Sequence, residues 1–245
     1  FQPPTGSKDG EYWESDLMYL GPRRYLVLVE ALTNFSLAIP VNTRHETSIS
    51  NAAKIWKTYL ESYFNVTKVT VYSDREGALQ GLSSISSPTL AIAVTRTSAE
   101  GHANRAEVLI RTIKERARSI IYSLPYKLPD VLLDNLVRFV VQMKNLLPAT
   151  LSADSTPLER VRGLKLKHSD LKNLTFGTTG HAFIPHRTSK DDATSEEGIV
   201  VGFDQLNPRN KSIYVLDTKR CVSRIKFIPS NISEKSLASL QNIQA

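Results

Sequence analysis

The stretch from His102 to Ile121 constrains the fold of this chain most, because its side chains follow the period of an amphipathic helix. At 100° per residue one face is apolar, and it comprises Ala106, Leu109, Ile110, Ile113, Ala117, Ile120 and Ile121. An adjoining stripe begins with an acid and continues with cations: Glu107, Arg111, Lys114 and Arg118. An i,i+4 ion pair explains the first two members of this stripe, but not the cations that follow. The pattern favours a carboxylate that holds a metal ion, with phosphate-binding cations behind it.

A metal site needs more acids than Glu107, because a hard divalent ion takes several oxygen ligands. Two acids lie upstream in strand-like sequence: Asp16 within residues 12–22, and Asp74 directly after the β-rich run Val69–Ser73. An acid on a central strand, an acid at a strand end and an acid on a following helix form a D…D…E set. Such a set predicts a divalent metal site that acts on phosphate.

The motifs around these acids resemble those of the integrases of Ty1/copia-type LTR retrotransposons, which share a catalytic core with retroviral integrases. Residues 107–118 are similar to the family's Glu-Arg-x-x-Arg-Thr-Ile-x-x-x-Ala-Arg helix, and Asp16 to Pro22 resembles its Asp-x-x-Gly-Pro segment with a longer spacer. Asp74 stands in the place of the second aspartate. Further similar motifs follow in the same order: Asn145-Leu146-Leu147-Pro148, Thr156-Pro157-Leu158-Glu159, Leu171 to Gly177, and Lys190 with Gly198 to Phe203. The resemblance covers roughly residues 12–228.

This resemblance implies a DDE-type polynucleotidyl transferase that forms part of a Pol polyprotein. Asp16, Asp74 and Glu107 would be its catalytic residues and would hold two Mg²⁺ or Mn²⁺ ions per active site. The implied reactions are 3′-end processing and strand transfer of the element's cDNA into host DNA. The implied partners are the element's DNA ends, target DNA, further copies of the chain in a dimer or tetramer, and a host tethering factor. The implied location is the nucleus, with a cytoplasmic particle stage.

Some residues near the three acids leave alternatives open. Glu14, which shares a strand face with the first acid, and Glu76 are rivals for the first two positions, and Glu100 is a rival for the third. Arg75 and Glu76 follow the second acid where the family has Asn-Gly, and Val108 stands where its helix has Arg. The second interpretation is therefore a catalytically decayed or domesticated, integrase-derived protein that binds DNA or supports assembly.

The net charge of +7 and the pI near 9.4 favour a polyanionic partner, of which nucleic acid is the commonest. Contacts with DNA phosphates set affinity and salt dependence rather than sequence choice. Two groups of cations are predicted to make such contacts: Arg111, Lys114 and Arg118, and then Lys165, Lys167 and Lys172.

The cysteine count and the hydropathy of the sequence exclude other classes of protein. Cys221 is the only cysteine, so an internal disulfide framework and a Cys-rich zinc site within these residues are excluded. The five histidines show no paired metal-ligand spacing. No stretch of 18 apolar residues or signal-peptide pattern occurs, so no membrane partner is expected. Because the chain begins at Phe1 without the zinc module of retroelement integrases, we expect a fragment or a processed product.

The order of predicted elements is three strands, a helix, a strand, a short connection, a strand and a helix, which is the order of an RNase H-like fold. We therefore predict an α/β chain: an RNase H-like catalytic core with a mixed five-stranded sheet and helices on both faces, then a small β-rich module. The core elements are strands at 13–20, 25–32, 36–41, 69–73 and 89–95 and helices at 47–64, 102–121 and 129–148, with a short helix possible at 77–82. Later strands are expected at 180–184, 198–203, 212–216 and 221–227. The predicted domains are a linker (1–11), the core (12–150), a basic connector (151–178), the C-terminal module (179–230) and a polar tail (231–245).

Overall fold

The computed structural model of the chain comprises two compact units. The first unit is Phe1–Arg116 with Val140–Lys165, and the second is Ala117–Phe139 with Leu166–Ala245. The described residues are 2–73, 77–96, 104–148, 154–163, 165, 175–184, 194–204, 210–231, 233, 234, 236, 238 and 240.

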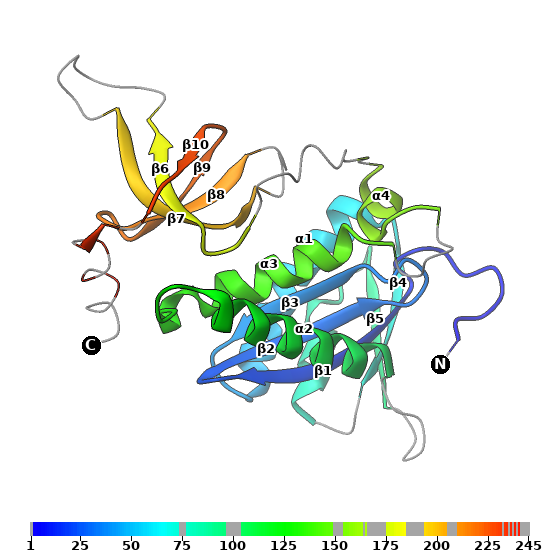
Figure 1. The fold of residues 1–245 in the computed structure, drawn as a ribbon. Helices are drawn as coiled ribbons and strands as arrows, with labels where there is room; N and C mark the ends of the chain where they lie inside the picture. The colour runs from blue at the N-terminus through cyan, green and yellow to red at the C-terminus, as the bar shows by residue number, and fades with distance from the viewer. Residues whose placement is uncertain are drawn as a thin grey trace. The chain divides into compact units, whose positions relative to one another are not determined.

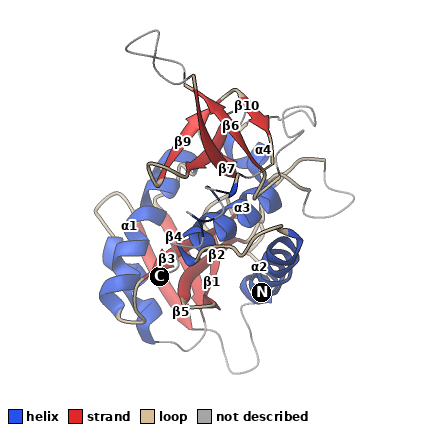
Figure 2. Ribbon diagram, turned by 60° about the vertical axis from the view of Figure 1, so that its left-hand side comes forward, coloured by secondary structure: helices blue, strands red, loops and turns tan. Residues whose placement is uncertain are grey.

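The first unit contains a mixed five-stranded sheet in the order β3-β2-β1-β4-β5. Its strands are β1 (Tyr12–Leu20), β2 (Arg23–Glu30), β3 (Ser36–Val41), β4 (Lys68–Ser73) and β5 (Ala91–Arg96). The strands β1 to β3 form an antiparallel meander, whereas β4 pairs in parallel with both β1 and β5. The helix α1 (Glu46–Tyr63) leads from β3 to β4, and a 3₁₀ helix, η1 (Gly77–Ile85), precedes β5. Figures 1 and 2 show α1 on one face of the sheet and the first part of α2 (Asn104–Ser123) on the other. This is the RNase H-like core that the sequence predicts.

An aromatic cluster fills the space between α1 and the sheet. The indole of Trp13 on β1 meets the rings of Trp56 and Phe64 edge-on, with ring centroids 5.4 Å apart in both pairs. Trp13 and Trp56 are fully buried. The side chains at 13, 15 and 17 of β1 therefore face α1, and those at 14 and 16 face the opposite side.

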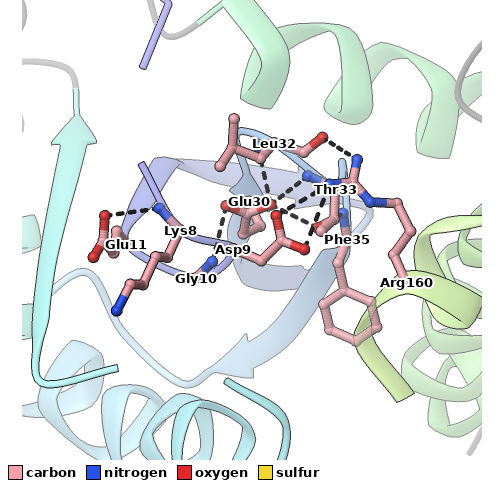
Figure 3. Close-up of polar contacts among 9 residues, drawn as sticks. All are labelled: Lys8, Asp9, Gly10, Glu11, Glu30, Leu32, Thr33, Phe35 and Arg160. Atoms are coloured by element: carbon pink, nitrogen blue, oxygen red, sulfur yellow. Dashed lines mark hydrogen bonds and ion pairs between the residues drawn. The ribbon is translucent and has the colours of Figure 1, made fainter. Parts of the chain in front are cut away.

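A second contact on the α1 side surrounds Glu30, the fully buried last residue of β2 (Figure 3). Its carboxylate accepts hydrogen bonds from the backbone nitrogens of Gly10 (3.1 Å), Leu32 (3.0 Å) and Thr33 (2.5 Å), and from the Thr33 hydroxyl (2.6 Å). Gly10 has a φ of +92°, and a Cβ there would lie 2.7 Å from Phe64, so only glycine brings this amide to the carboxylate without strain. Glu30 thus fixes both the turn after β2 and the segment before β1.

The helix α2 presents its predicted apolar face to the core: Ala106, Leu109, Ile113 and Ala117 are at most 3% exposed. The next predicted helix, 129–148, is shorter in the structure and consists of a 3₁₀ turn at Asp130–Leu132 followed by α3 (Leu133–Asn145). At its end the side chain of Asn145 accepts from the backbone nitrogen of Ser36 (2.9 Å) and donates to the Ser36 carbonyl (2.8 Å). Because β3 is an edge strand, this amide satisfies backbone groups that no neighbouring strand pairs. The first residue of the Asn-Leu-Leu-Pro motif therefore has a structural contact.

A short helix, α4 (Pro157–Arg162), lies in the segment predicted as an unpatterned connector. Its start is a capping box, in which the Thr156 hydroxyl accepts from the backbone of Glu159 and the Glu159 carboxylate accepts from the backbone of Thr156. Arg160 on this helix forms an ion pair with Asp9, with Nη2 3.1 Å from Oδ1 (Figure 3). The motif Thr-Pro-Leu-Glu is thus a helix start.

The second unit contains another five-stranded sheet, in the order β10-β6-β7-β8-β9. Its strands are β6 (Thr179–Phe183), β7 (Ser195–Phe203), β8 (Lys211–Val215), β9 (Arg220–Arg224) and β10 (Phe227–Pro229). The sequence predicted a single strand at 221–227, but the structure divides this run between opposite edges of the sheet. Three Cα steps separate Arg224 from Phe227 and reach about 11 Å, whereas a flat five-stranded sheet is about 19 Å wide. The sheet must therefore curl.

Residues of the predicted polar tail dock on this second sheet. Ser236 and Leu240 are 6% and 1% exposed. The Glu197 carboxylate on β7 accepts from the Ser233 backbone nitrogen (3.2 Å), the Ser233 hydroxyl (3.1 Å) and the Ser236 hydroxyl. Burial alone would raise the pKa of Glu197, but these hydrogen bonds lower it below its ordinary value. The Glu197 carboxylate thus holds Ser233 and Ser236 of the tail.

Candidate active site

Asp16 lies in the middle of β1, half-buried, on the face of the sheet opposite the aromatic cluster. Its cross-strand neighbour is Val27 of β2. One carboxylate oxygen, Oδ1, accepts a hydrogen bond from the backbone nitrogen of Leu17 (2.7 Å). The position is the one predicted for the first acid, a central strand of the core sheet.

The parallel ladder between β1 and β4 ends beside Asp16. Its last pair is Ser15 with Ser73, and Asp16 is the next residue of β1. Asp74 is the next residue of the sequence after Ser73, but it lies outside the described residues. The assignment of Asp74 to this site therefore stays a prediction, and so does the competition from Glu76 and Glu100, which are also outside the described residues.

Glu107 lies in the first turn of α2 and is exposed. Of the cations that follow it, Arg111 and Arg118 are exposed and Lys114 is half-buried. Lys165 is exposed, whereas Lys167 and Lys172 lie outside the described residues. The helix thus presents the acid and the cations of the stripe away from its buried face, as the periodicity predicts.

The start of α2 is fixed to β1 by a contact that the sequence did not predict. The backbone nitrogen of Arg105 donates to Oε2 of Glu14 (2.7 Å), and Nη1 of Arg105 lies 2.7 Å from Oε1 of the same carboxylate. The Glu14 side chain is 1% exposed and that of Arg105 is 28% exposed. Arg105 therefore satisfies both oxygens of a buried carboxylate.

This contact relates the two described acids of the candidate site. Glu14 and Asp16 are two residues apart on β1 and project from the same face. Arg105 and Glu107 are two residues apart in the first turn of α2. The ion pair thus holds the turn that carries Glu107 against the strand that carries Asp16.

The sequence indicates Glu14 only as a rival of Asp16 for the first position of the site. Its engagement by Arg105 favours Asp16 as the ligand of that strand, because both Glu14 oxygens already have a partner. No local pattern links Glu14 with Arg105, which lies 91 residues later. The only signal was an acid in an otherwise buried strand, which has to find a cation or several hydrogen-bond donors.

The donor chemistry of the described acids fits a hard divalent cation, because both offer carboxylate oxygens. In the described parts of the chain no three His, Cys, Asp or Glu side chains form a group that could hold a metal ion. The D…D…E set has two members there, Asp16 and Glu107, and its third, Asp74, is in the undescribed segment 74–76. The N-terminal end of a helix also favours negative charge, which suits phosphate beside α2.

Comparisons with known proteins give structural neighbours only. No family model matches the chain, and no curated protein matches it. The catalytic core domain of BIV integrase is similar at 14% identity with a TM-score of 0.45, over 62% of this chain and 93% of that one. A chain of the simian T-cell lymphotropic virus intasome in complex with PP2A regulatory subunit B56 gamma is similar at 16% identity with a TM-score of 0.49, over 90% and 76%. Strand order and helix positions by themselves define the RNase H-like fold. None of the helices in the described residues is long and apolar enough to cross a membrane.

Proposed function

We propose that this chain is a retrotransposon integrase of the Ty1/copia type, encoded as part of a Pol polyprotein. Its reactions are 3′-end processing of the element's cDNA and strand transfer of that cDNA into host DNA. The observation that supports this function best is the Glu14–Arg105 contact, because it sets the turn of Glu107 over the strand of Asp16. Asp16 on β1 and Glu107 in the first turn of α2 are two members of the D…D…E set.

In this proposal Asp16, Asp74 and Glu107 hold two Mg²⁺ or Mn²⁺ ions. Bound there, such ions stabilise charge on the transferring phosphate and activate water or a DNA 3′-hydroxyl. Arg111, Lys114 and Arg118 continue along the same helix, and in this proposal they neutralise the DNA backbone. A second set of phosphate contacts is proposed for Lys165, Lys167 and Lys172.

The proposal extends to partners and location. A net charge of +7 suits binding of both the element's ends and target DNA. The joining of two DNA ends calls for more than one active site, so a dimer or tetramer is proposed. The reaction takes place in the nucleus after a cytoplasmic particle stage, with a host tethering factor as a further partner.

The second candidate is an integrase-derived protein that binds DNA without catalysis. The observation in its favour is Arg75, a cation directly after Asp74 that competes with a metal ion for the carboxylate. Metal binding separates the two candidates, because only the enzyme needs Mn²⁺ on its acids.

The decisive test is Mn²⁺-dependent strand transfer with a preprocessed DNA end. The wild type is compared with Asp16→Asn, Asp74→Asn and Glu107→Gln, and with Glu115→Gln as a matched control, since Glu115 is exposed on the same helix. We expect each of the first three changes to lower the rate at least about 100-fold without loss of DNA binding, and the control to keep the rate. A wild type that binds DNA but neither joins ends nor binds Mn²⁺ contradicts the proposal and favours the non-catalytic protein.

A further inference from the structure

We propose that Arg105 is a positioning residue, which locks the first turn of α2 onto β1 through Glu14 and thereby sets where Glu107 stands relative to Asp16. The inference rests on the proposed function, since it assigns a role in the geometry of that same site.

The lock has two points of attachment on one residue. The backbone nitrogen of Arg105 and its guanidinium each lie 2.7 Å from a different oxygen of Glu14. One contact fixes the start of the helix along its axis, and the second, from a side chain, fixes how the turn is rotated. Charge-assisted contacts of this length are among the strong hydrogen bonds of proteins. Because the Glu14 side chain is 1% exposed, water does not replace them.

Rotation of this turn matters for the candidate site. Residues two positions apart in a helix differ by about 200° around its axis. Arg105 and Glu107 therefore lie on opposite sides of the buried row of Ala106 and Leu109. A turn held at Arg105 therefore holds the direction in which Glu107 projects. The apolar contacts of Ala106 and Leu109 do not fix this direction by themselves, because apolar packing tolerates small rotations.

The pair also removes a competing charge from the neighbourhood of Asp16. Glu14 projects from the same face of β1, two residues away. An unpaired carboxylate there could draw a divalent cation from the intended ligands. Paired with Arg105, it adds no net charge beside Asp16.

The backbone contact explains how this helix begins. The first four N–H groups of a helix lack partners within it, and a side chain of the preceding residue usually supplies one. Here the acceptor comes from a strand 91 residues earlier. The Glu14 carboxylate thus ties the start of the helix to the sheet.

The test measures metal binding, kinetics and local order in Arg105→Ala and Arg105→Lys. The matched control is Arg116→Ala, which removes an exposed cation from the same helix. For Arg105→Ala we expect kcat for strand transfer to fall about 10- to 100-fold and Mn²⁺ to bind about 10-fold more weakly, while KM for DNA stays within about twofold. Arg105→Lys keeps one charged contact and should recover part of the loss. The control should match the wild type.

Amide hydrogen exchange of residues 108–111, whose N–H groups bond back onto the first turn of α2, gives a readout that does not need activity. We expect their exchange to quicken in Arg105→Ala, with circular dichroism showing that the protein remains folded. The lock is refuted if exchange, Mn²⁺ affinity and kcat all match the wild type. A higher KM for DNA at unchanged kcat also overturns it, because Arg105 would then be a DNA contact.

If the proposed function itself is wrong, the same measurements give a different set of results. In that case the wild type itself neither joins ends nor binds Mn²⁺, and a role of Arg105 in catalysis is overturned with it. Exchange of residues 108–111 still shows whether Arg105 holds the turn of the folded protein.

Discussion

Two fully buried glutamates of the core sheet, Glu14 and Glu30, are stabilised in different ways. Glu30 is the cross-strand neighbour of Trp13, so it lies on the α1 face, whereas Glu14 lies on the α2 face. Glu30 accepts from three backbone amides and one hydroxyl, all neutral groups. Glu14 is met by Arg105, a charged residue of a distant helix.

The difference shows what each kind of partner achieves. Neutral donors come from residues 10, 32 and 33, close to β1 and β2, so the carboxylate of Glu30 organises its own surroundings. The partner of Glu14 comes from α2, so the contact sets the position of one element against another. Buried charge is costly in both cases and persists only where it is paired or hydrogen-bonded. Two buried acids on neighbouring strands can thus have different roles: one stabilises the segments around it, and the other fixes the position of a helix against the sheet.

The largest effect is expected for Glu30→Ala, which leaves three backbone amides and a hydroxyl without their acceptor. Each unsatisfied buried donor costs about 1–3 kcal/mol, part of which relaxation recovers, so the free energy of unfolding should fall by about 3–5 kcal/mol. Urea unfolding of the wild type and the variant measures this. Glu61→Ala is the control, because Glu61 is 58% exposed and lies 3.8 Å from Lys57, and its loss should cost less than about 0.5 kcal/mol. Equal losses for the two variants would show that neutral donors do not make Glu30 a structural acid.

Lys144 provides the cationic counterpart of Glu30, since its ammonium donates to the Asn34 carbonyl (2.5 Å) and the Ser36 hydroxyl (2.6 Å). Burial, with a smaller effect of Arg116, lowers its pKa from 10.5 to about 8. Between these two pH values the folded chain has released a proton that the unfolded chain still binds, so stability should rise with pH there. Relative to Lys144→Met, the rise should be on the order of 3 kcal/mol, complete near pH 10.5 and absent below pH 8.

Urea unfolding at several pH values across this window checks the dependence. Lys57→Met serves as the control, because Lys57 pairs with the exposed carboxylate of Glu61. A difference between wild type and Lys144→Met that stays flat or falls with pH contradicts the expected sign. It would mean that folding does not draw the proton from Lys144 in this pH window.

The order of strands and helices along the chain of the core could be predicted from the sequence, because hydrophobic period records which side chains are buried. The buried row of α2 was found in this way. The division of 221–227 into β9 and β10 was not, since the run of β-forming residues does not show that the chain changes edges at Ile225. The helix α4 was readable from Thr156, Pro157 and Glu159, which together are a helix start signal.

For the candidate site, the sequence predicted only which residue types occur and their order along the chain. Asp16 and Glu107 follow from their surroundings in a strand and a helix, and the structure places both in such elements. The pairing of Glu14 with Arg105 was not predictable, because a contact between residues 91 positions apart leaves no period in the sequence. Sequence pattern thus finds the elements and their faces, whereas the contacts that align the elements depend on the folded chain.

The smallest effects should separate two ion pairs of the first unit. Arg105 and Glu14 are 28% and 1% exposed at 2.7 Å, whereas Arg160 and Asp9 are 40% and 41% exposed at 3.1 Å. Double-mutant cycles in unfolding free energy, with Gln or Asn for the acid and Met for the arginine, isolate each pairwise coupling. We expect about 2 kcal/mol for the buried pair and at most about 0.5 kcal/mol for the exposed one.

Salt makes this distinction sharper, because it screens exposed charges much more than buried ones. In about 1 M NaCl, where the Debye length is about 3 Å, the coupling of Arg160 with Asp9 should vanish and that of Arg105 with Glu14 should keep most of its value. Similar couplings, or a common loss in salt, would mean that water reaches Glu14 as easily as Asp9. Glu14 would then be a surface acid with a mobile partner, and it could not hold α2 in one rotation. If the contact of Arg105 with Glu14 aligns α2 with the strand of Asp16, the pairwise coupling of these two residues must therefore persist in high salt.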